Sequence, residues 1–205
     1  MIKVYGSVFS RASMVMCALE ELGLEYENIE MLPRSEGTQS DEYRALNPTG
    51  KLPTLVDGEL VLWESQAILF YLARKYGAQK LWVEGFAQEA ELYRWSLFIS
   101  NQLEVAALDM LLSVKFARDG QVDEQKQAVL VDVLDRFLPV LEAHLIGREF
   151  LVSDHLTVAD LHGAAVLAWP KLAGFDYSRY PAVAAWVRKI LALPSQKRVR
   201  ERSAG

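Results

Sequence analysis

The spacing of apolar residues changes once along the chain, and this change constrains the fold more than any other feature. Up to residue 77, short runs typical of strands alternate with runs of helical spacing. From residue 88 onward only helical spacing remains, and it predicts long helices at 88–117, 123–146, 157–169 and 181–192. We therefore expect an α/β domain over 1–77, a linker at 78–87 and an all-helical domain over 88–205.

The first domain opens with a strand, a helix and a second strand. Ile2–Tyr5 and Tyr26–Met31 have the short pattern of strands. Between them, Arg11–Leu22 repeats its apolar residues at intervals of three and four, as an amphipathic helix does. A polar loop over 33–40 and a short helix near 42–46 follow. A unit of this kind pairs its two strands in parallel.

A hairpin and another helix complete the first domain. Asp57-Gly58 stands between two apolar runs and is a strong signal for a hairpin turn. After the second strand, Ser65–Tyr76 reads as a helix, with Ser65 as its N-cap and Gly77 beyond its end. The hairpin is expected to add antiparallel strands to the sheet.

Composition argues against several classes of function. The net charge of −5 and the scattered basic residues argue against nucleic acid as a partner. The single cysteine, Cys17, excludes a disulfide within the chain and fits a reducing compartment. We see no signal peptide and no apolar run of bilayer length, so we expect a cytoplasmic protein without a membrane partner. The basic cluster Lys197–Arg202 reads as a solvated tail.

The segment Asn47-Pro-Thr-Gly-Lys-Leu-Pro53 makes a rigid approach to the hairpin. A proline directly before a strand removes a ladder donor and marks an edge or a bend. A cis Leu52-Pro53 bond would turn the Leu52 backbone outward as a docking edge. Only roughly 5% of such bonds are cis, so position alone leaves the isomer open.

Two predicted helix starts could bind an anion. Glu64-Ser65 directly follows a strand, and Ser10 follows a strand and a glycine loop. Free N–H groups and the helix dipole favour negative charge at such places, including a thiolate. Each serine could equally be only an N-cap, and Ser7 and Ser13 compete with Ser10 for either role.

Four stretches together resemble the glutathione-binding core of the cytosolic glutathione transferase superfamily. They are Lys51-Leu-Pro-Thr-Leu-Val-Asp-Gly, Glu64-Ser-Gln-Ala-Ile-Leu-Phe-Tyr-Leu-Ala, Asn47-Pro-Thr-Gly and Val4-Tyr-Gly-Ser-Val-Phe-Ser10. The resemblance is to the serine-type members, such as the bacterial, theta and phi classes. It implies a thioredoxin-like N-terminal domain followed by an all-α helical bundle domain.

The resemblance also implies residue roles. Pro53 matches the family's cis-proline, and the Leu52 backbone should pair with the cysteinyl part of glutathione. Ser10 matches the serine whose hydroxyl hydrogen-bonds the glutathione sulfur. The full set of glutathione contacts implied is Gln39, Lys51, Leu52, Pro53, Glu64 and Ser65. The sequence departs from many relatives at Val8-Phe9, where they carry proline, and at Thr38, where some classes carry histidine.

The implied activity is conjugation of the glutathione thiolate to a small hydrophobic electrophile. Glutathione would be the co-substrate, no metal is expected, and the family usually forms homodimers. Phe9, Met110 and Phe116 are candidates for the electrophile pocket. The alternatives are a glutathione-dependent isomerase or disulfide reductase, or a non-catalytic glutathione-binding interaction module.

Polar residues of the second domain point to structure and not to chemistry. Thr157 and Asp160 have the spacing of a capping box at the start of a buried helix. The three histidines are too dispersed for a metal site, and His162 is expected to be a satisfied core residue. Cys17, in the middle of a helix, is expected to be a small buried residue.

Overall fold

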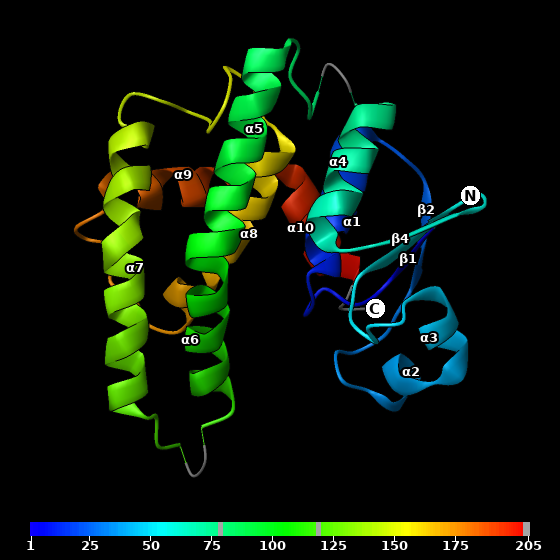
Figure 1. Ribbon diagram of the computed structural model, residues 1–205, viewed down its shortest axis with the longest axis horizontal. Coiled ribbons are helices and arrows are strands. Elements are labelled where there is room, and N and C mark those ends of the chain that lie inside the picture. The colour runs from blue at the N-terminus through cyan, green and yellow to red at the C-terminus, as the bar shows by residue number, and fades with distance from the viewer. Residues whose placement is uncertain (78–79, 118–119, 203–205) are drawn as a thin grey trace. The chain divides into compact units, whose positions relative to one another are not determined.

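A computed structural model describes residues 1–77, 80–117 and 120–202 (Figure 1). The chain forms two compact units, one made of Met1–Trp82 together with the chain from Ala192 onward, the other of Val83–Leu191. The predicted linker at 78–87 includes two residues outside the described part. The boundary between the units falls at Trp82/Val83.

The first unit is built on a four-stranded mixed sheet. Its strands are β1 (Ile2–Tyr5), β2 (Tyr26–Ile29), β3 (Thr54–Asp57) and β4 (Leu60–Trp63), in the order β2-β1-β3-β4. β1 and β2 are parallel, whereas β3 runs antiparallel to both β1 and β4. The strand–helix–strand unit and the hairpin predicted from the sequence are both present.

Helices α1, α4 and α10 pack together on one side of this sheet (Figure 1). The helices of the unit are α1 (Ala12–Leu22), α2 (Glu36–Gln39), α3 (Asp41–Leu46), α4 (Ser65–Tyr76) and α10 (Pro194–Arg202). α2 lies in the segment predicted to be a polar loop. A helix of four residues is too short to show apolar periodicity, so the sequence carried no signal for it.

The prediction of a solvated tail at Lys197–Arg202 is wrong. Glu20 on α1 accepts hydrogen bonds from Arg198 Nε at 2.6 Å and Arg202 Nη2 at 2.9 Å, and Val199 is buried. The segment is therefore a docked helix of the first unit and not the end of the helical domain predicted over 88–205. The sequence shows no sign of this helix, because a single buried valine among basic residues does not form the apolar stripe of an amphipathic helix.

The elements of the second unit are all helices over its described residues. It contains α5 (Phe86–Phe98), a π-helical turn η1 (Ile99–Glu104), α6 (Val105–Lys115), α7 (Glu124–Leu145), α8 (Val158–Leu172) and α9 (Pro181–Leu191). α8 contacts α5, α6 and α9 and is buried along most of its length. All four predicted helical segments are confirmed, although η1 interrupts the first.

One helical run reaches the length of a membrane span, which the sequence analysis did not expect. Phe86–Lys115 is 30 residues long and sufficiently apolar, because α5, η1 and α6 continue without a break. The run supplies Leu92, Ile99 and Leu103 to the buried core of the second unit. Only 28% of its most apolar 18-residue window is buried, so core packing accounts for part of its apolar composition.

Candidate active site

Three chain segments meet at one end of the sheet. The register pairs Tyr5 with Thr54 and Thr54 with Trp63, so these residues lie side by side on β1, β3 and β4. β1 and β4 leave the sheet here, and β3 enters it here. The segments that adjoin this end are therefore neighbours in space: Gly6–Ser10, Leu52-Pro53 and Glu64-Ser65.

Gly6 allows the first two segments to approach closely. Its φ of +142° lies where side chains are rare, and an added Cβ would stand 2.4 Å from the Ala12 Cβ. The same position is 3.1 Å from Ser10 Oγ and 3.7 Å from the Leu52 Cβ. The Ser10 hydroxyl and the Leu52 side chain therefore both lie within 4 Å of the position that a Gly6 side chain would occupy.

The Ser10 hydroxyl stands just before helix α1 and is half-buried. It accepts the Ala12 N–H at 3.1 Å and the Ser7 N–H at 3.3 Å, and it donates to the Ser7 carbonyl at 2.8 Å. Two backbone donors polarise this oxygen. The hydroxyl donates its own proton to the neutral Ser7 carbonyl. An anionic acceptor would form a stronger hydrogen bond and would compete for that proton.

The other two serines of the loop are placed differently. Ser13 donates its hydroxyl to the Ser10 carbonyl at 2.9 Å, so it caps the local turn. Ser7 is buried, and its hydroxyl has no hydrogen-bond partner in the described part of the chain. Of the three, Ser10 combines exposure with a polarised hydroxyl.

The Leu52-Pro53 bond is cis, as the resemblance implied. Pro53 is buried and Leu52 is half-buried. Just before them, the Lys51 carbonyl accepts the Tyr43 hydroxyl at 2.7 Å and Asn47 Nδ2 at 2.8 Å. The sequence pattern alone does not reveal these two donors. The Asn47-Pro pair was the available signal, because asparagine often bonds to nearby backbone in turns.

Ser65 is not the N-cap that the sequence predicted. It is the first residue of α4, and the N-cap is Glu64, with a φ of +74° and no side-chain capping bond. Such a φ is costly for a side chain other than glycine and tends to occur at functional sites. The Ser65 hydroxyl makes no hydrogen bond to any described residue, and Ser65 itself is only 6% exposed.

Gly50, the residue before Lys51, lets the chain pass close to Gln39. An added Cβ at Gly50 would lie 3.3 Å from Gln39 Nε2 and 3.0 Å from the Thr38 carbonyl. Gln39 Oε1 accepts a hydrogen bond from Arg44 Nη2 at 2.5 Å, and this bond holds the Gln39 side chain at the surface. The Lys51 side chain is exposed.

The chain matches known proteins over nearly its whole length. Residues 1–74 match the glutathione S-transferase N-terminal domain, and residues 103–194 match the C-terminal domain. Glutathione S-transferase 4 of Zea mays is 33% identical, with 97% of this chain and 91% of the relative covered. The probable glutathione S-transferase GSTF2 of Oryza sativa subsp. japonica is 35% identical, with 96% and 94% covered.

The chain belongs to the glutathione S-transferase family. A solved structure agrees: glutathione transferase URE2P6 from Phanerochaete chrysosporium, in complex with oxidized glutathione, has a TM-score of 0.86 at 27% identity. That comparison covers 99% of this chain and 96% of the other. The predicted family, the thioredoxin-like plus helical fold and the assignment as a glutathione S-transferase enzyme are therefore confirmed.

The residues suggested for the electrophile pocket of this transferase differ widely in exposure. Phe9, in the first unit, is 69% exposed, and Phe116, at the end of α6, is 62% exposed. Met110, also on α6, is only 1% exposed and lies in the core of the second unit. Their role in binding an electrophile stays a prediction.

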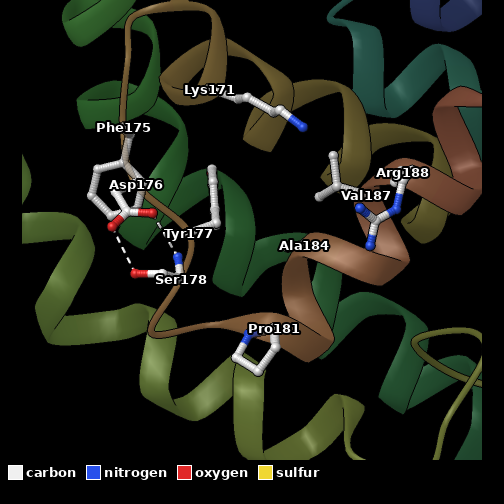
Figure 2. A pocket seen from close by; sticks show the side chains of 9 residues that line it. All are labelled: Lys171, Phe175, Asp176, Tyr177, Ser178, Pro181, Ala184, Val187 and Arg188. Atoms are coloured by element: carbon white, nitrogen blue, oxygen red, sulfur yellow. Dashed lines mark hydrogen bonds between the residues drawn. The ribbon is translucent and has the colours of Figure 1, made fainter.

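The second unit of the transferase holds a cavity of about 410 Å³ between the end of α8 and α9 (Figure 2). Phe175, Tyr177 and Val187 supply apolar surface, with Lys171 and Arg188 on one side. On the other side, the Asp176 carboxylate accepts the Ser178 hydroxyl at 2.6 Å. None of the site residues expected from the sequence lines this cavity.

The Asp160 carboxylate is buried at the start of α8. Oδ2 accepts the Thr157 N–H at 2.9 Å and its hydroxyl at 2.8 Å, as the capping-box spacing predicted. Oδ1 accepts the Leu151 N–H at 2.8 Å and the Trp186 indole N–H at 3.0 Å, which the spacing did not reveal. Burial raises the pKa of Asp160, and these four hydrogen bonds oppose that shift.

His162 and Cys17 are buried, as expected of structural residues. His162 Nε2 lies 3.0 Å from Glu104 Oε2 in the buried core. Among the described residues, no group of histidine, cysteine and carboxylate side chains could hold a metal ion. Cys17 is buried, and that burial raises the pKa of its thiol to about 12, far from the reactive range.

Proposed function

We propose that the end of the sheet formed by Gly6–Ser10, Leu52-Pro53 and Glu64-Ser65 is the glutathione site, where the thiolate attacks a small hydrophobic electrophile. The observation that carries this proposal is the convergence of a polarised hydroxyl, a cis-proline edge and a helix start on one end of the sheet. Each of the three suits a different part of the tripeptide.

The sulfur is assigned to Ser10. The hydroxyl already receives two backbone N–H groups, so rotating its proton from the Ser7 carbonyl to the sulfur would stabilise the thiolate over the thiol. The thiolate is the nucleophile, and holding it beside the electrophile lowers the entropic cost of reaction. The protein needs no cysteine of its own.

The two charged ends of glutathione are assigned to opposite sides of the site. The α4 N-terminus and the Ser65 hydroxyl suit the γ-glutamyl carboxylate, and the Glu64 carboxylate suits the adjacent ammonium. Lys51, with Gln39 beside it, suits the glycyl carboxylate. These assignments follow the resemblance by position and are supported by the proximity of Gln39 to the Gly50-Lys51 turn.

Three further features belong to the proposal. The electrophile would be a hydrophobic molecule bound with help from Phe9, Met110 and Phe116, as in detoxification. The active form would be a homodimer. The location would be cytoplasmic, consistent with a single cysteine that is buried and has a raised pKa.

The test is Ser10→Ala, with Ser13→Ala as its matched control on the same loop. We expect Ser10→Ala to lower kcat with a model aryl halide by about 10²-fold, the scale for losing one donor to a developing anion. The acidic limb of its rate profile, along which the rate rises with pH, should move to higher pH because the bound thiol ionises less easily. Glutathione affinity, measured by calorimetry, should change little, and Ser13→Ala should retain activity.

Each part of the proposal has its own contradicting result. Full turnover in Ser10→Ala would remove Ser10 from catalysis and return the question to Ser7. Folded wild-type protein that releases no heat with glutathione would overturn the site as a whole and favour an interaction module.

A further inference from the structure

Two buried side chains converge on one backbone carbonyl next to the proposed docking edge. The Lys51 carbonyl accepts the Tyr43 hydroxyl at 2.7 Å and Asn47 Nδ2 at 2.8 Å. Tyr43 is 3% exposed and Asn47 is 1% exposed. A carbonyl has two lone pairs, so this one is fully satisfied by donors that lie inside the unit.

The two donors are themselves held in place. Thr54 Oγ1, at the first residue of β3, lies 2.8 Å from the Tyr43 hydroxyl and 3.1 Å from Asn47 Nδ2. Asn47 Oδ1 accepts the Thr49 N–H at 3.1 Å and its hydroxyl at 2.7 Å. The orientation of the Lys51 carbonyl is therefore coupled to the sheet and to the turn.

This orientation also fixes the direction of the Leu52 N–H. The Lys51–Leu52 peptide is planar and trans, so its C=O and N–H point in opposite directions. With the carbonyl aimed at Tyr43 and Asn47, the Leu52 N–H points away from them. It makes no hydrogen bond to any residue that the structure describes. An unpaired main-chain donor is suited to receive an acceptor from a ligand.

We propose that Tyr43 and Asn47 are positioning residues that hold the Lys51–Leu52 peptide plane so that the Leu52 N–H meets a backbone carbonyl of glutathione. The inference rests on the docking edge proposed above. The two side chains touch the peptide and not the ligand. Their contribution is to prevent the plane from rotating, which would turn the N–H away from the site.

The conservative variant is Tyr43→Phe, which keeps the ring and its contact with the Tyr5 ring, whose centroid is 5.8 Å away. It removes one of the two donors to the Lys51 carbonyl. Asn47→Asp is the second variant, because it keeps the acceptor for Thr49 and places a carboxylate oxygen against the carbonyl. The matched control is Tyr71→Phe, which removes a hydroxyl that donates to Asp57 at 2.7 Å in the same unit.

Steady-state kinetics with reduced glutathione and an aryl halide separate positioning from stability. We expect Tyr43→Phe to raise KM for glutathione about 5- to 10-fold and Asn47→Asp to raise it further, with kcat at saturation within about 2-fold. The control, Tyr71→Phe, should lower Tm by an amount similar to that in Tyr43→Phe but leave KM for glutathione unchanged. Unchanged KM in both variants, or an equal rise in the control, would overturn the inference.

Amide NMR of the intact protein distinguishes this inference from the site proposal. The non-reactive probe is S-methylglutathione. In the wild type, the Leu52 amide proton should shift downfield on titration, and in Tyr43→Phe the shift should shrink. A Leu52 amide that does not respond in the wild type would contradict the docking edge itself. A full response that is equal in wild type and Tyr43→Phe would leave the docking edge standing and reject the role of Tyr43 and Asn47.

Discussion

At the scale of single residues, Asp160 shows how one carboxylate can organise several segments. Its oxygens accept donors from Leu151, Thr157 and Trp186, which lie before α8, at its N-terminus and on α9. A carboxylate accepts four hydrogen bonds without needing a donor of its own. The residue is therefore suited to structure, and nothing in its environment requires it to react.

Asp160→Asn should destabilise the fold without affecting chemistry. The amide group would direct N–H donors at groups that are themselves donors, which leaves buried partners unsatisfied. We expect a loss of about 3 kcal/mol in the free energy of unfolding, measured by urea denaturation. The folded fraction at low temperature should retain wild-type kcat.

The control is Asp176→Asn, an exposed carboxylate bonded only within its own loop, which should leave the free energy of unfolding nearly unchanged. Reduced kcat in fully folded Asp160→Asn would contradict a purely structural role.

Individual contacts could be predicted only where they are local in sequence. The spacing of Thr157 and Asp160 revealed the cap, whereas Trp186 joins the same carboxylate from 26 residues away. The same limit explains Ser65. Its position before a helical run suggested an N-cap, but the backbone at Glu64 takes a positive φ that only the assembled structure reveals.

At the scale of elements, the β3–β4 hairpin is tied to α4 through one aspartate. Asp57 Oδ2 accepts the Tyr76 hydroxyl at 2.6 Å, the Tyr71 hydroxyl at 2.7 Å and Lys75 Nζ at 2.9 Å. Burial disfavours the ionised carboxylate, but these hydrogen bonds outweigh it and lower the pKa of Asp57 to about 2. Asp57, which the sequence predicted only as part of the hairpin turn, therefore also holds α4 against the hairpin.

The stabilisation from Asp57 should therefore depend on pH. The unfolded carboxyl has a pKa of about 3.9, above the folded value, so the stabilising effect is fully present above pH 4. It is lost as the pH falls toward 2. Asp57→Asn should cost about 1 kcal/mol at pH 7, a modest figure for a pair at the surface.

Urea denaturation of wild type and Asp57→Asn in parallel, from pH 7 down to pH 2.5, measures the effect as a difference. Other acid-sensitive groups cancel because both proteins contain them. The gap between the two curves should close at the acidic end. A gap that stays constant or widens below pH 4 would show that Asp57 acts through shape and not through its charge.

Most elements were predictable because their apolar residues carry a clear period. β1, α1, β3, β4 and the long helices follow from spacing and turn residues alone. α2 and α10 could not be predicted in this way, because α2 has only four residues and α10 is mostly charged. Their formation depends on neighbours, such as the α1 carboxylate that α10 contacts, and a local pattern does not encode neighbours.

At the scale of the whole molecule, the first unit is built from both ends of the chain. The N-terminal segment supplies the sheet and helices α1 to α4, and α10 returns from residue 194 to pack on α1. The residues that bind α10 are Glu20, through two arginines, and Tyr26, whose ring lies 4.7 Å from the Arg202 guanidinium. The family's two-domain plan therefore does not divide this chain at a single point.

Removing α10 should loosen the face of α1 that contains Cys17. At pH 8 the buried thiol, with a pKa of about 12, is almost entirely un-ionised. A chain ending at Leu193 would bring solvent closer to α1 and lower this pKa toward about 8.5. Labelling by a disulfide reagent should then accelerate, by up to about 10³-fold if exposure is complete. Because Cys17 is the single cysteine, the signal has one source.

The matched control is Lys197→Ala, which removes only an exposed ion pair with Glu201 within α10. It should label at the wild-type rate. Val199→Asp, which places a charge at a buried position of α10, should label almost as fast as the truncated chain. Slow labelling in both the truncated chain and Val199→Asp, with unchanged Tm, would mean that α10 rests on α1 without stabilising it. Fast labelling would instead show that the last helix protects α1, the helix that begins just after the proposed catalytic Ser10.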